Sequence, residues 1–237
     1  MGDVFGDGGK KHQLKEKNMI EISTSILSVE KENSLKTFYN LETAKTDYFH
    51  IDVMDGKFVE NNTAETMLEY AENIKHISNL PLDVHLMVEN VEEYIEQYIP
   101  LEPSFITFHY EAFENKEALL AAISKVKNDG IKCGLSIKPN TKIEEIYEYL
   151  PYIHMVLIMT VEPGKGGQPL IPHTVEKIKQ LRQYITENNI DIYIEADGGI
   201  NLDTISQIKD AGIDIVVVGN AVIKSENYAE TIKKLKE

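Results

Sequence analysis

The chain has 237 residues, 42% of them hydrophobic, which is enough for one large α/β domain or two small ones. Its net charge of −15 argues against nucleic acid or an anionic membrane as a partner, although backbone amides could still hold a small anionic substrate. No apolar run approaches the roughly 20 residues of a membrane span, and the single cysteine, Cys133, favours a soluble protein of the reducing cytoplasm.

Residues 1–18 are rich in Gly and Lys and show no hydrophobic periodicity. They also lack the apolar core of a signal peptide. We interpret this stretch as a disordered extension or a remnant of cloning. The folded domain is therefore expected over residues 19–237.

Short apolar runs alternate with amphipathic segments along the whole of this domain, which predicts strands followed by helices. The expected strands are 21–27, 48–54, 82–88, 104–109, 131–137, 153–160, 191–196 and 214–218. The expected helices are 33–45, 64–78, 90–98, 115–129, 142–149, 172–188, 202–211 and 226–236.

Eight strand–helix pairs predict an α/β fold of the (β/α)8 TIM-barrel type. An open doubly wound sheet is the alternative. We prefer the barrel because polar residues end strands that lie far apart in sequence, and a closed barrel brings all of those ends to one mouth. Thr141, Asn201 and Ser225 stand near predicted helix starts and are candidate N-caps.

The strand 48–54 carries the first chemical signal. Side chains two apart on a strand share a face, so His50, Asp52 and Met54 point the same way. An imidazole beside a carboxylate is costly to bury without a purpose. The following Asp55-Gly56 is a turn signal. A structural histidine beside a turn-forming aspartate is the other interpretation of this strand.

Two further strands end in residues of the same kind. His85 and Met87 share a face on strand 82–88, and Asp197 follows strand 191–196. Any single histidine is more often structural than a ligand. Three strand ends with ligand-type residues, however, favour a site for one divalent metal ion, and mixed nitrogen and oxygen ligands suit Zn, Fe, Mn or Co.

Glycine-rich loops follow the last three strands. They comprise Pro163–Gln168, Gly198-Gly199 and Gly219-Asn220. Loops at this position in barrels commonly hold a phosphate through unobstructed backbone amides. Any one of these loops could be a tight turn only, but three in succession favour a phosphate site. Lys165 could add charge, or it could simply be solvated.

Three methionines, Met54, Met87 and Met159, fall near strand ends. Methionine at such positions is usually packing. A soft apolar lining over a charged intermediate would instead exclude water and strengthen local electrostatics. The sequence leaves both interpretations open.

Five motifs, in order and at matching spacing, resemble the ribulose-phosphate 3-epimerase family from about Ile20 to the C-terminus. They are Ser25–Ser28, His50–Gly56, Asp83–Val88, Pro163–Gln168 and Asp197–Gly199. The resemblance implies a metal-dependent TIM barrel that interconverts D-ribulose 5-phosphate and D-xylulose 5-phosphate in the pentose phosphate pathway. It also implies a homo-oligomer.

The resemblance further implies roles for individual residues. The metal ligands would be His50, Asp52, His85 and Asp197, and the acid/base pair would be Asp52 and Asp197. Substrate and phosphate would contact Ser25, His85, Gly164, Lys165, Gly166, Gly167, Gly198, Gly199, Gly219 and Asn220. Met54, Met87 and Met159 would cap the intermediate.

The chemistry agrees with that assignment. Epimerisation at C3 requires a proton to leave one face and another to arrive on the opposite face. A carbon acid beside a ketone is too weak for an unaided carboxylate, so a metal would stabilise the enediolate. Two carboxylates flanking its plane would serve as base and acid.

The chain departs from the family's usual residues at five positions, which are Thr24, Glu60, Tyr110, Lys165 and Asn220. None of these changes removes a ligand or an acid/base residue. They alter the loops around the substrate, so the sugar is less fixed than the chemistry. D-allulose 6-phosphate stays open as an alternative substrate.

Two further alternatives have less support. An orotidine-phosphate decarboxylase-like site would need a lysine between two aspartates at the end of the second strand, whereas Lys57 comes after Asp55. A non-catalytic sugar-phosphate sensor would have no need for the acid/base pair. Deuterium exchange at C3 distinguishes the sensor from an epimerase.

Overall fold

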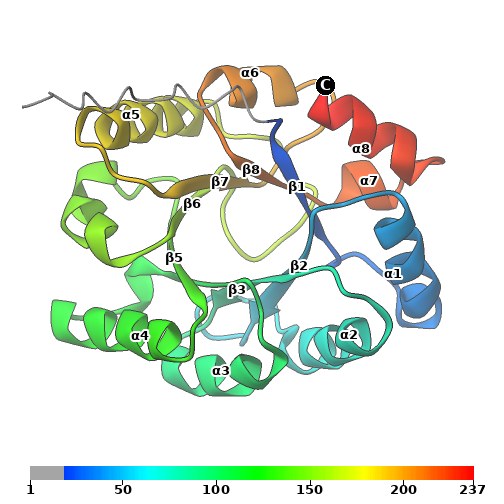
Figure 1. The fold of residues 1–237 in the computed structure, drawn as a ribbon, viewed down its shortest axis with the longest axis horizontal. Coiled ribbons are helices and arrows are strands. Elements are labelled where there is room, and N and C mark those ends of the chain that lie inside the picture. Colours follow the sequence, from blue (N-terminus) through cyan, green and yellow to red (C-terminus); the bar gives the residue numbers. More distant parts are fainter. Residues whose placement is uncertain (1–18) are drawn as a thin grey trace, which may run out of the picture.

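The computed structural model describes residues 19–237, and residues 1–18, with the interpretation given to them above, lie outside the described part. The strands form one closed barrel in the sequential order β1 to β8, and all neighbouring pairs are parallel. Figure 1 shows the ring of strands enclosed by helices. The predicted (β/α)8 TIM barrel is therefore confirmed, and the open doubly wound sheet is excluded.

Each strand is short and almost fully buried, as expected for a parallel sheet covered on both sides. The strands are β1 Glu21–Ser25, β2 Tyr48–Met54, β3 Leu82–Met87, β4 Phe105–His109, β5 Lys132–Ile137, β6 Met155–Met159, β7 Tyr193–Asp197 and β8 Ile215–Val218.

Helices follow the strands on the outside of the barrel. The α-helices are α1 Ser34–Thr43, α2 Ala64–Ile77, α3 Val91–Tyr98, α4 Lys116–Asn128, α5 His173–Glu187, α6 Ile205–Asp210, α7 Asn220–Ile223 and α8 Tyr228–Lys236. The 3₁₀ segments are η1 Lys31–Asn33, η2 Ile99–Leu101, η3 Tyr110–Ala112 and η4 Ile143–Tyr152.

The packing of α2 on β2 illustrates how the outer layer forms. Met67, Tyr70, Ala71 and Ile74 recur at helical spacing and are the buried residues of α2. They belong to the same apolar cluster as Ile51 and Val53 of β2, which point away from the barrel axis. Each such fully buried large side chain contributes roughly 1.5–3 kcal/mol, so the outer layer fixes which face of the strand turns inward.

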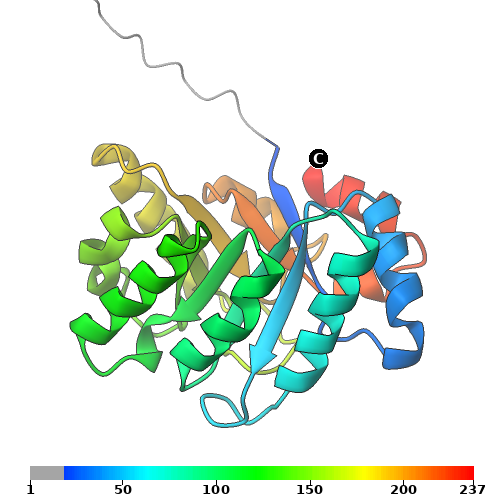
Figure 2. The same cartoon turned by 60° about the horizontal axis from the view of Figure 1, so that its bottom comes forward.

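The register between β2 and β3 assembles one side of the barrel interior. His50 pairs with Asp83, Asp52 with His85, and Met54 with Met87. Because these positions alternate with outward-facing ones, all three pairs point into the barrel. The carboxyl ends of the strands and their loops form the mouth (Figure 2).

The structure differs from the sequence prediction around residue 142. The predicted helix 142–149 is the 3₁₀ segment η4, which extends to Tyr152 and contains Pro151. Proline removes an amide donor, and the longer 3₁₀ turn accommodates it. The short α7, directly after β8, was not predicted, because four residues carry no readable periodicity.

Two of the three predicted N-caps, Thr141 and Ser225, are wrong, whereas Oδ1 of Asn201 accepts from the amides of Asp203 and Thr204 in the turn that leads into α6. The residues at these helix boundaries are Lys142 for η4, Thr204 for α6 and Asn227 for α8. The hydroxyl of Thr141 donates instead to Glu111, a contact across to the loop after β4. The hydroxyl of Ser225 donates to the carbonyl of Val222, so at these two positions the polar side chain has a partner other than a helix amide. Within the described residues, no helix combines the length and apolarity of a membrane span.

Candidate metal centre and substrate pocket

The four predicted ligand residues come together at the carboxyl end of the barrel. His50 and Asp52 lie on β2, His85 on β3 and Asp197 at the end of β7. One donor atom from each lies within 4.8 Å of the others. This grouping follows from the closed barrel, because β2 and β7 are not neighbours in the sheet.

The distances within the group connect both imidazoles to both carboxylates. Nε2 of His50 lies 3.3 Å from Oδ1 of Asp52 and 3.9 Å from Oδ2 of Asp197. Nδ1 of His85 lies 3.6 Å from each of the same two oxygens. Two nitrogens and two oxygens therefore surround one point.

The unpartnered atoms of this group fit a divalent cation. Nε2 of His50 and Nδ1 of His85 are buried and have no hydrogen-bond partner. Buried polar atoms are normally satisfied, so two ring nitrogens without a partner, aimed at two carboxylates, fit the ligand set of a cation. Histidine nitrogen and aspartate oxygen are established ligands of transition metals.

The electrostatics of the group lead to the same conclusion. Burial opposes charge on His50, yet Asp52 and Asp83 outweigh it and raise the pKa of His50 well above its ordinary value. Burial likewise opposes charge on His85, but the nearby carboxylates of Asp197 and Asp52 raise its pKa. The carboxylates therefore favour a positive charge within the group. Protonated imidazoles can carry this charge, and a bound cation would carry it with the imidazoles neutral.

Two acidic residues that were not predicted as site residues, Asp83 and Glu195, lie beneath His50 in the barrel interior. Nδ1 of His50 lies 2.6 Å from Oδ2 of Asp83, and Oγ of Ser23 donates to the same oxygen over 2.7 Å. Glu195 is fully buried beside them, and its pKa is raised well above the ordinary value by burial and by Asp83. The signal was available, since Asp83 and Glu195 stand two positions before His85 and Asp197 and share their faces.

A second pair was also missed, on the other side of His85. Nε2 of His85 lies 3.0 Å from Nε2 of His109, at the end of β4. Nδ1 of His109 lies 3.2 Å from Oε2 of Glu111. The sequence signal was a histidine at a strand end, one strand further round the barrel from His85.

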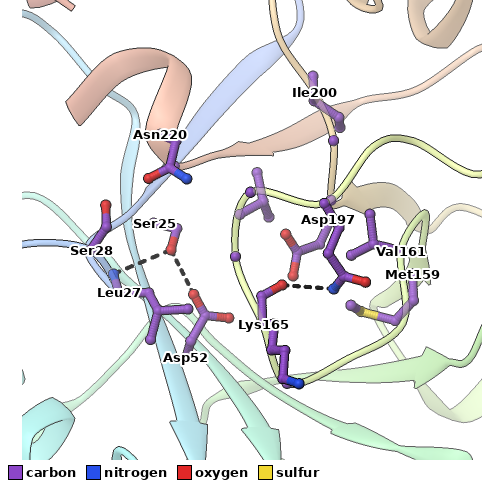
Figure 3. A pocket seen from close by; sticks show the side chains of 18 of the residues that line it. Ser25, Leu27, Ser28, Asp52, Met159, Val161, Lys165, Asp197, Ile200 and Asn220 are labelled. Carbon is purple, nitrogen blue, oxygen red and sulfur yellow. Dashed lines mark hydrogen bonds between the residues drawn. The ribbon is translucent and has the colours of Figure 1, made fainter. Parts of the chain in front are cut away.

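A cavity of about 760 Å³ opens above the metal centre at the mouth of the barrel. Asp52 reaches it from one side and Asp197 from another, as Figure 3 shows. The lining includes nearly all the predicted substrate residues, which are Ser25, Gly164, Lys165, Gly166, Gly167, Gly198, Gly199, Gly219 and Asn220. His85 is fully buried beneath the lining, and its contact with the substrate stays a prediction.

Ser25 orients one of the aspartates. Its hydroxyl donates to Oδ2 of Asp52 over 2.6 Å and accepts from the amide of Leu27 (Figure 3). Oδ1 of Asp52 is thereby left for the group formed with His50 and His85. Burial opposes the ionised form, but the imidazole of His50 outweighs it and lowers the pKa of Asp52.

Glycine is required where the loops after β6 and β7 meet. Gly198 and Gly199 have φ angles of 119° and 67°, in the left-handed region. A Cβ on Gly199 would lie 2.3 Å from the backbone nitrogen of Leu170. A Cβ on Gly198 would lie 2.3 Å from a methyl group of Val161. The loops after β6 and β7 therefore pack against each other at two positions where a Cβ has no room.

Two lysines contribute positive charge to the cavity lining. Lys165, in the loop after β6, also lies 3.7 Å from Glu60 in the loop after β2. This ion pair links the loops after β2 and β6 at the mouth of the barrel. Lys224, just after α7, was not predicted and lines the same cavity.

The three methionines have the predicted location. Met54, Met87 and Met159 line the cavity and are at most 2% exposed. Asp55 has the turn-forming role, because Oδ1 accepts from the amides of Lys57 and Phe58. Its other oxygen accepts from the amide of Glu89 and ties the loop to the end of β3.

Comparison with known proteins adds a family. Residues 21–223 match the sequence profile of the "Ribulose-phosphate 3 epimerase family". The chain is 36% identical to "Ribulose-phosphate 3-epimerase" of Methanocaldococcus jannaschii over 92% of its own length and 91% of that protein. It is 35% identical to the protein of the same name from Helicobacter pylori, over 91% of the chain and 96% of that protein.

Two solved structures that share the fold are more distant in sequence than these relatives. "Crystal structure of KGPDC from Streptococcus mutans" aligns with a TM-score of 0.64 at 11% identity, over 92% of this chain and 96% of that one. "Crystal Structure of 3-Hexulose-6-Phosphate Synthase" aligns with a TM-score of 0.63 at 13% identity, over 92% and 98%. At these identities the likeness concerns the barrel alone.

Proposed function

Because the chain belongs to the ribulose-phosphate 3-epimerase family, we propose that it interconverts D-ribulose 5-phosphate and D-xylulose 5-phosphate by epimerisation at C3. The name of its relatives supports the substrate, and the pentose phosphate pathway follows from the family. The observation that carries the proposal is a pair of aspartates, Asp52 and Asp197, that reach one cavity from non-neighbouring strands.

The two aspartates supply the acid/base chemistry. Inversion at C3 requires one group to remove the proton from one face and another to deliver a proton to the opposite face. Asp52 and Asp197 come from β2 and β7 and line one cavity, so a substrate bound there would have a carboxylate from each strand within reach of C3. Asp52 is held ionised, as a base must be, by its imidazole neighbours.

One divalent cation, of Zn, Fe, Mn or Co, completes the proposal. When bound, it supplies the positive charge that stabilises an enediolate. His50, Asp52, His85 and Asp197 would hold it, and their orphaned ring nitrogens support this assignment. Ser25 contributes by fixing the rotation of the Asp52 carboxylate.

The remaining lining residues bind the substrate and exclude water. Backbone amides of the loops at 164–167, 198–199 and 219–220 would hold the phosphate, since they line one end of the cavity. Lys165 adds positive charge there. Met54, Met87 and Met159 would cover the apolar side of the intermediate, where exclusion of water strengthens the electrostatic interactions. The buried state of the single cysteine agrees with a reducing, cytoplasmic setting.

D-Allulose 6-phosphate remains the second candidate substrate. The specific observation in its favour is that Glu60, Lys165 and Asn220 depart from the usual family residues, and the last two line the cavity. A non-catalytic sugar-phosphate-binding protein is the alternative of another class. The complete aspartate pair, with its carboxylates at the cavity, counts against it.

Isotope exchange tests the proposal directly. Purified protein, supplied with Zn²⁺, Mn²⁺, Fe²⁺ or Co²⁺ in D₂O, is incubated with D-ribulose 5-phosphate and followed by NMR. We expect deuterium at C3 and accumulation of D-xylulose 5-phosphate. Absence of exchange with every metal would refute the epimerase and favour the binding protein. A higher kcat/KM with D-allulose 6-phosphate would change the substrate but keep the chemistry.

A further inference from the structure

The imidazole of His85 is connected to a carboxylate through a second imidazole. Nε2 of His85 lies 3.0 Å from Nε2 of His109, and Nδ1 of His109 lies 3.2 Å from Oε2 of Glu111. The two rings are nearly parallel, at an interplanar angle of 25°. Both histidines are fully buried, so water does not take the place of either contact.

The hydrogen positions in the series His85–His109–Glu111 follow from which ring nitrogen of His85 faces the aspartates. Nδ1 of His85 is the ring atom directed at Asp52 and Asp197, and a ligand nitrogen must offer a lone pair there. Nε2 of His85 then carries the hydrogen and donates to Nε2 of His109. The remaining hydrogen of His109 lies on Nδ1 and is donated to Glu111.

Glu111 is the ionised residue at the end of this hydrogen-bonded series. Oε1 accepts from the amide of Lys138 over 2.7 Å and from the hydroxyl of Thr141. Burial opposes its charge, but hydrogen bonding to His109 is the largest contribution that lowers the pKa of Glu111, to about 2. Both carboxylate oxygens therefore accept, and Oε2 is left for the imidazole.

The segment that holds Glu111 is itself clamped. Nζ of Lys177, on α5, donates to the carbonyls of Lys138, Pro139 and Thr141 at 2.6–3.0 Å. On the open side, the ring of Phe58 covers His109 at a centroid distance of 4.9 Å. The anchor is thus rigid and shielded, which is what orientation of a ligand requires.

We propose that His109 and Glu111 are positioning residues that fix the tautomer and ring orientation of His85 for a divalent cation. The proposal rests on the metal-dependent function proposed above. Under this proposal a carboxylate orients each of the two ligand histidines. His50 contacts Asp83 directly, and His85 is connected to Glu111 through His109. Neither His109 nor Glu111 lines the cavity.

The test measures metal binding without substrate. The unmodified protein, His109→Phe and Glu111→Gln are stripped of metal, and their affinities for Co²⁺ and Zn²⁺ are measured by competition with a chromophoric chelator. We expect a loss of about 10- to 100-fold in both variants, which is typical for removal of a hydrogen-bond partner of a ligand histidine. The visible absorption band of bound Co²⁺ should also shift, because the orientation of His85 relaxes.

Two further variants separate positioning from general packing. Thr141→Val removes a hydrogen bond to the same carboxylate at Oε1 and leaves Oε2 for His109. It should bind Co²⁺ within about twofold of the unmodified protein. His109→Gln can accept from His85 and donate to Glu111, so it should recover part of the affinity lost in His109→Phe. Melting curves of the stripped proteins verify that each variant folds.

The outcomes distinguish this proposal from the proposed function. Unchanged affinity and an unchanged Co²⁺ spectrum in folded Glu111→Gln would overturn the positioning role while leaving the metal site in place. An equal loss in Thr141→Val and Glu111→Gln would also overturn it, because the effect would then come from loop packing. Absence of metal binding in the unmodified protein would refute the metal-dependent function itself.

Discussion

Nδ1 of His50 lies 2.6 Å from Oδ2 of Asp83, and the two residues are direct register partners on β2 and β3. Because this contact occupies Nδ1, Nε2 of the same ring is left facing Asp52 and Asp197. Strand pairing therefore selects which ring nitrogen is available to a cation. The buried hydroxyl of Ser23 donates to the same carboxylate oxygen and fixes its position.

Replacing Asp83 should weaken metal binding although Asp83 is not a predicted ligand. In Asp83→Ala, the Nδ1 hydrogen of His50 loses its acceptor, and the ring is free to adopt the other tautomer or to rotate. We expect the dissociation constant for Zn²⁺ or Co²⁺ to rise by about 10- to 100-fold. Competition with a chromophoric chelator measures it without substrate.

Asp83→Asn is the matched control for this prediction, because its amide oxygen can still accept from His50. Its affinity should fall between those of the unmodified protein and Asp83→Ala. Equal affinity of the alanine variant and the unmodified protein would show that the contact with Asp83 does not orient His50.

The sequence predicted the barrel and the four residues His50, Asp52, His85 and Asp197 that it brings together. It could do so because two rules sufficed: side chains two apart share a face, and the carboxyl ends of parallel strands meet at one mouth. Both rules are local or topological. Neither requires knowledge of side-chain packing.

The supporting residues follow from those rules only in part. Asp83 is the second residue of β3 and shares a face with His85, so the first rule already directs it into the barrel, but only the register with His50 shows that it lies beneath the site. Glu111 depends on contacts with Lys138 and Thr141, 27 and 30 positions away. Such contacts arise from how loops of different strands pack, and a single sequence carries no signal for them.

Gly199→Ala should destabilise the protein and weaken phosphate binding. Gly199 has a φ of 67°, and a Cβ would lie 2.3 Å from the backbone nitrogen of Leu170, so the loops after β6 and β7 would have to separate. We expect a loss of about 1–3 kcal/mol in the free energy of unfolding, measured by urea denaturation, together with a raised KM for the sugar phosphate.

Gly130→Ala provides the comparison for Gly199→Ala. Gly130 has a similar φ of 77°, but nothing lies within 4 Å of a Cβ placed there. Gly130→Ala should lower the free energy of unfolding only by the strain of the backbone conformation, about 1 kcal/mol, and should leave KM unchanged. Equal effects of the two substitutions would mean that the close approach of the loops has no energetic consequence.

The metal-free protein should lose stability as the pH rises above 6.5. The pKa values of His50 and His85 are raised in the folded state from the ordinary 6.5. Their contribution is therefore complete below pH 6.5 and is lost as the pH rises through the folded-state values. For one such imidazole, the free energy of unfolding falls by about 1.4 kcal/mol per pH unit within that window.

Thermal melting between pH 6.5 and 9, with and without excess Zn²⁺, measures this effect. One kcal/mol corresponds to roughly 2–4 °C in a domain of this size. The fall in Tm should disappear when the cation is bound, because the cation then supplies the charge that the protons supplied. A flat Tm in chelator would indicate that the imidazoles are neutral in the metal-free protein.

Asp52→Asn and Asp197→Asn should each abolish epimerisation while the barrel stays folded. Loss of a positioned acid or base costs roughly 10²- to 10⁴-fold in rate, and each substitution also removes a predicted metal ligand, so the assays use saturating metal. One remaining carboxylate can still remove and return a proton on its own face. In D₂O we therefore expect any residual exchange at C3 to favour one ketose phosphate in Asp52→Asn and the other in Asp197→Asn.

Asp55→Asn, at a turn-forming aspartate outside the cavity lining, serves as the control and should retain turnover. Near-normal turnover of Asp52→Asn or Asp197→Asn at saturating metal would exclude the two-aspartate mechanism.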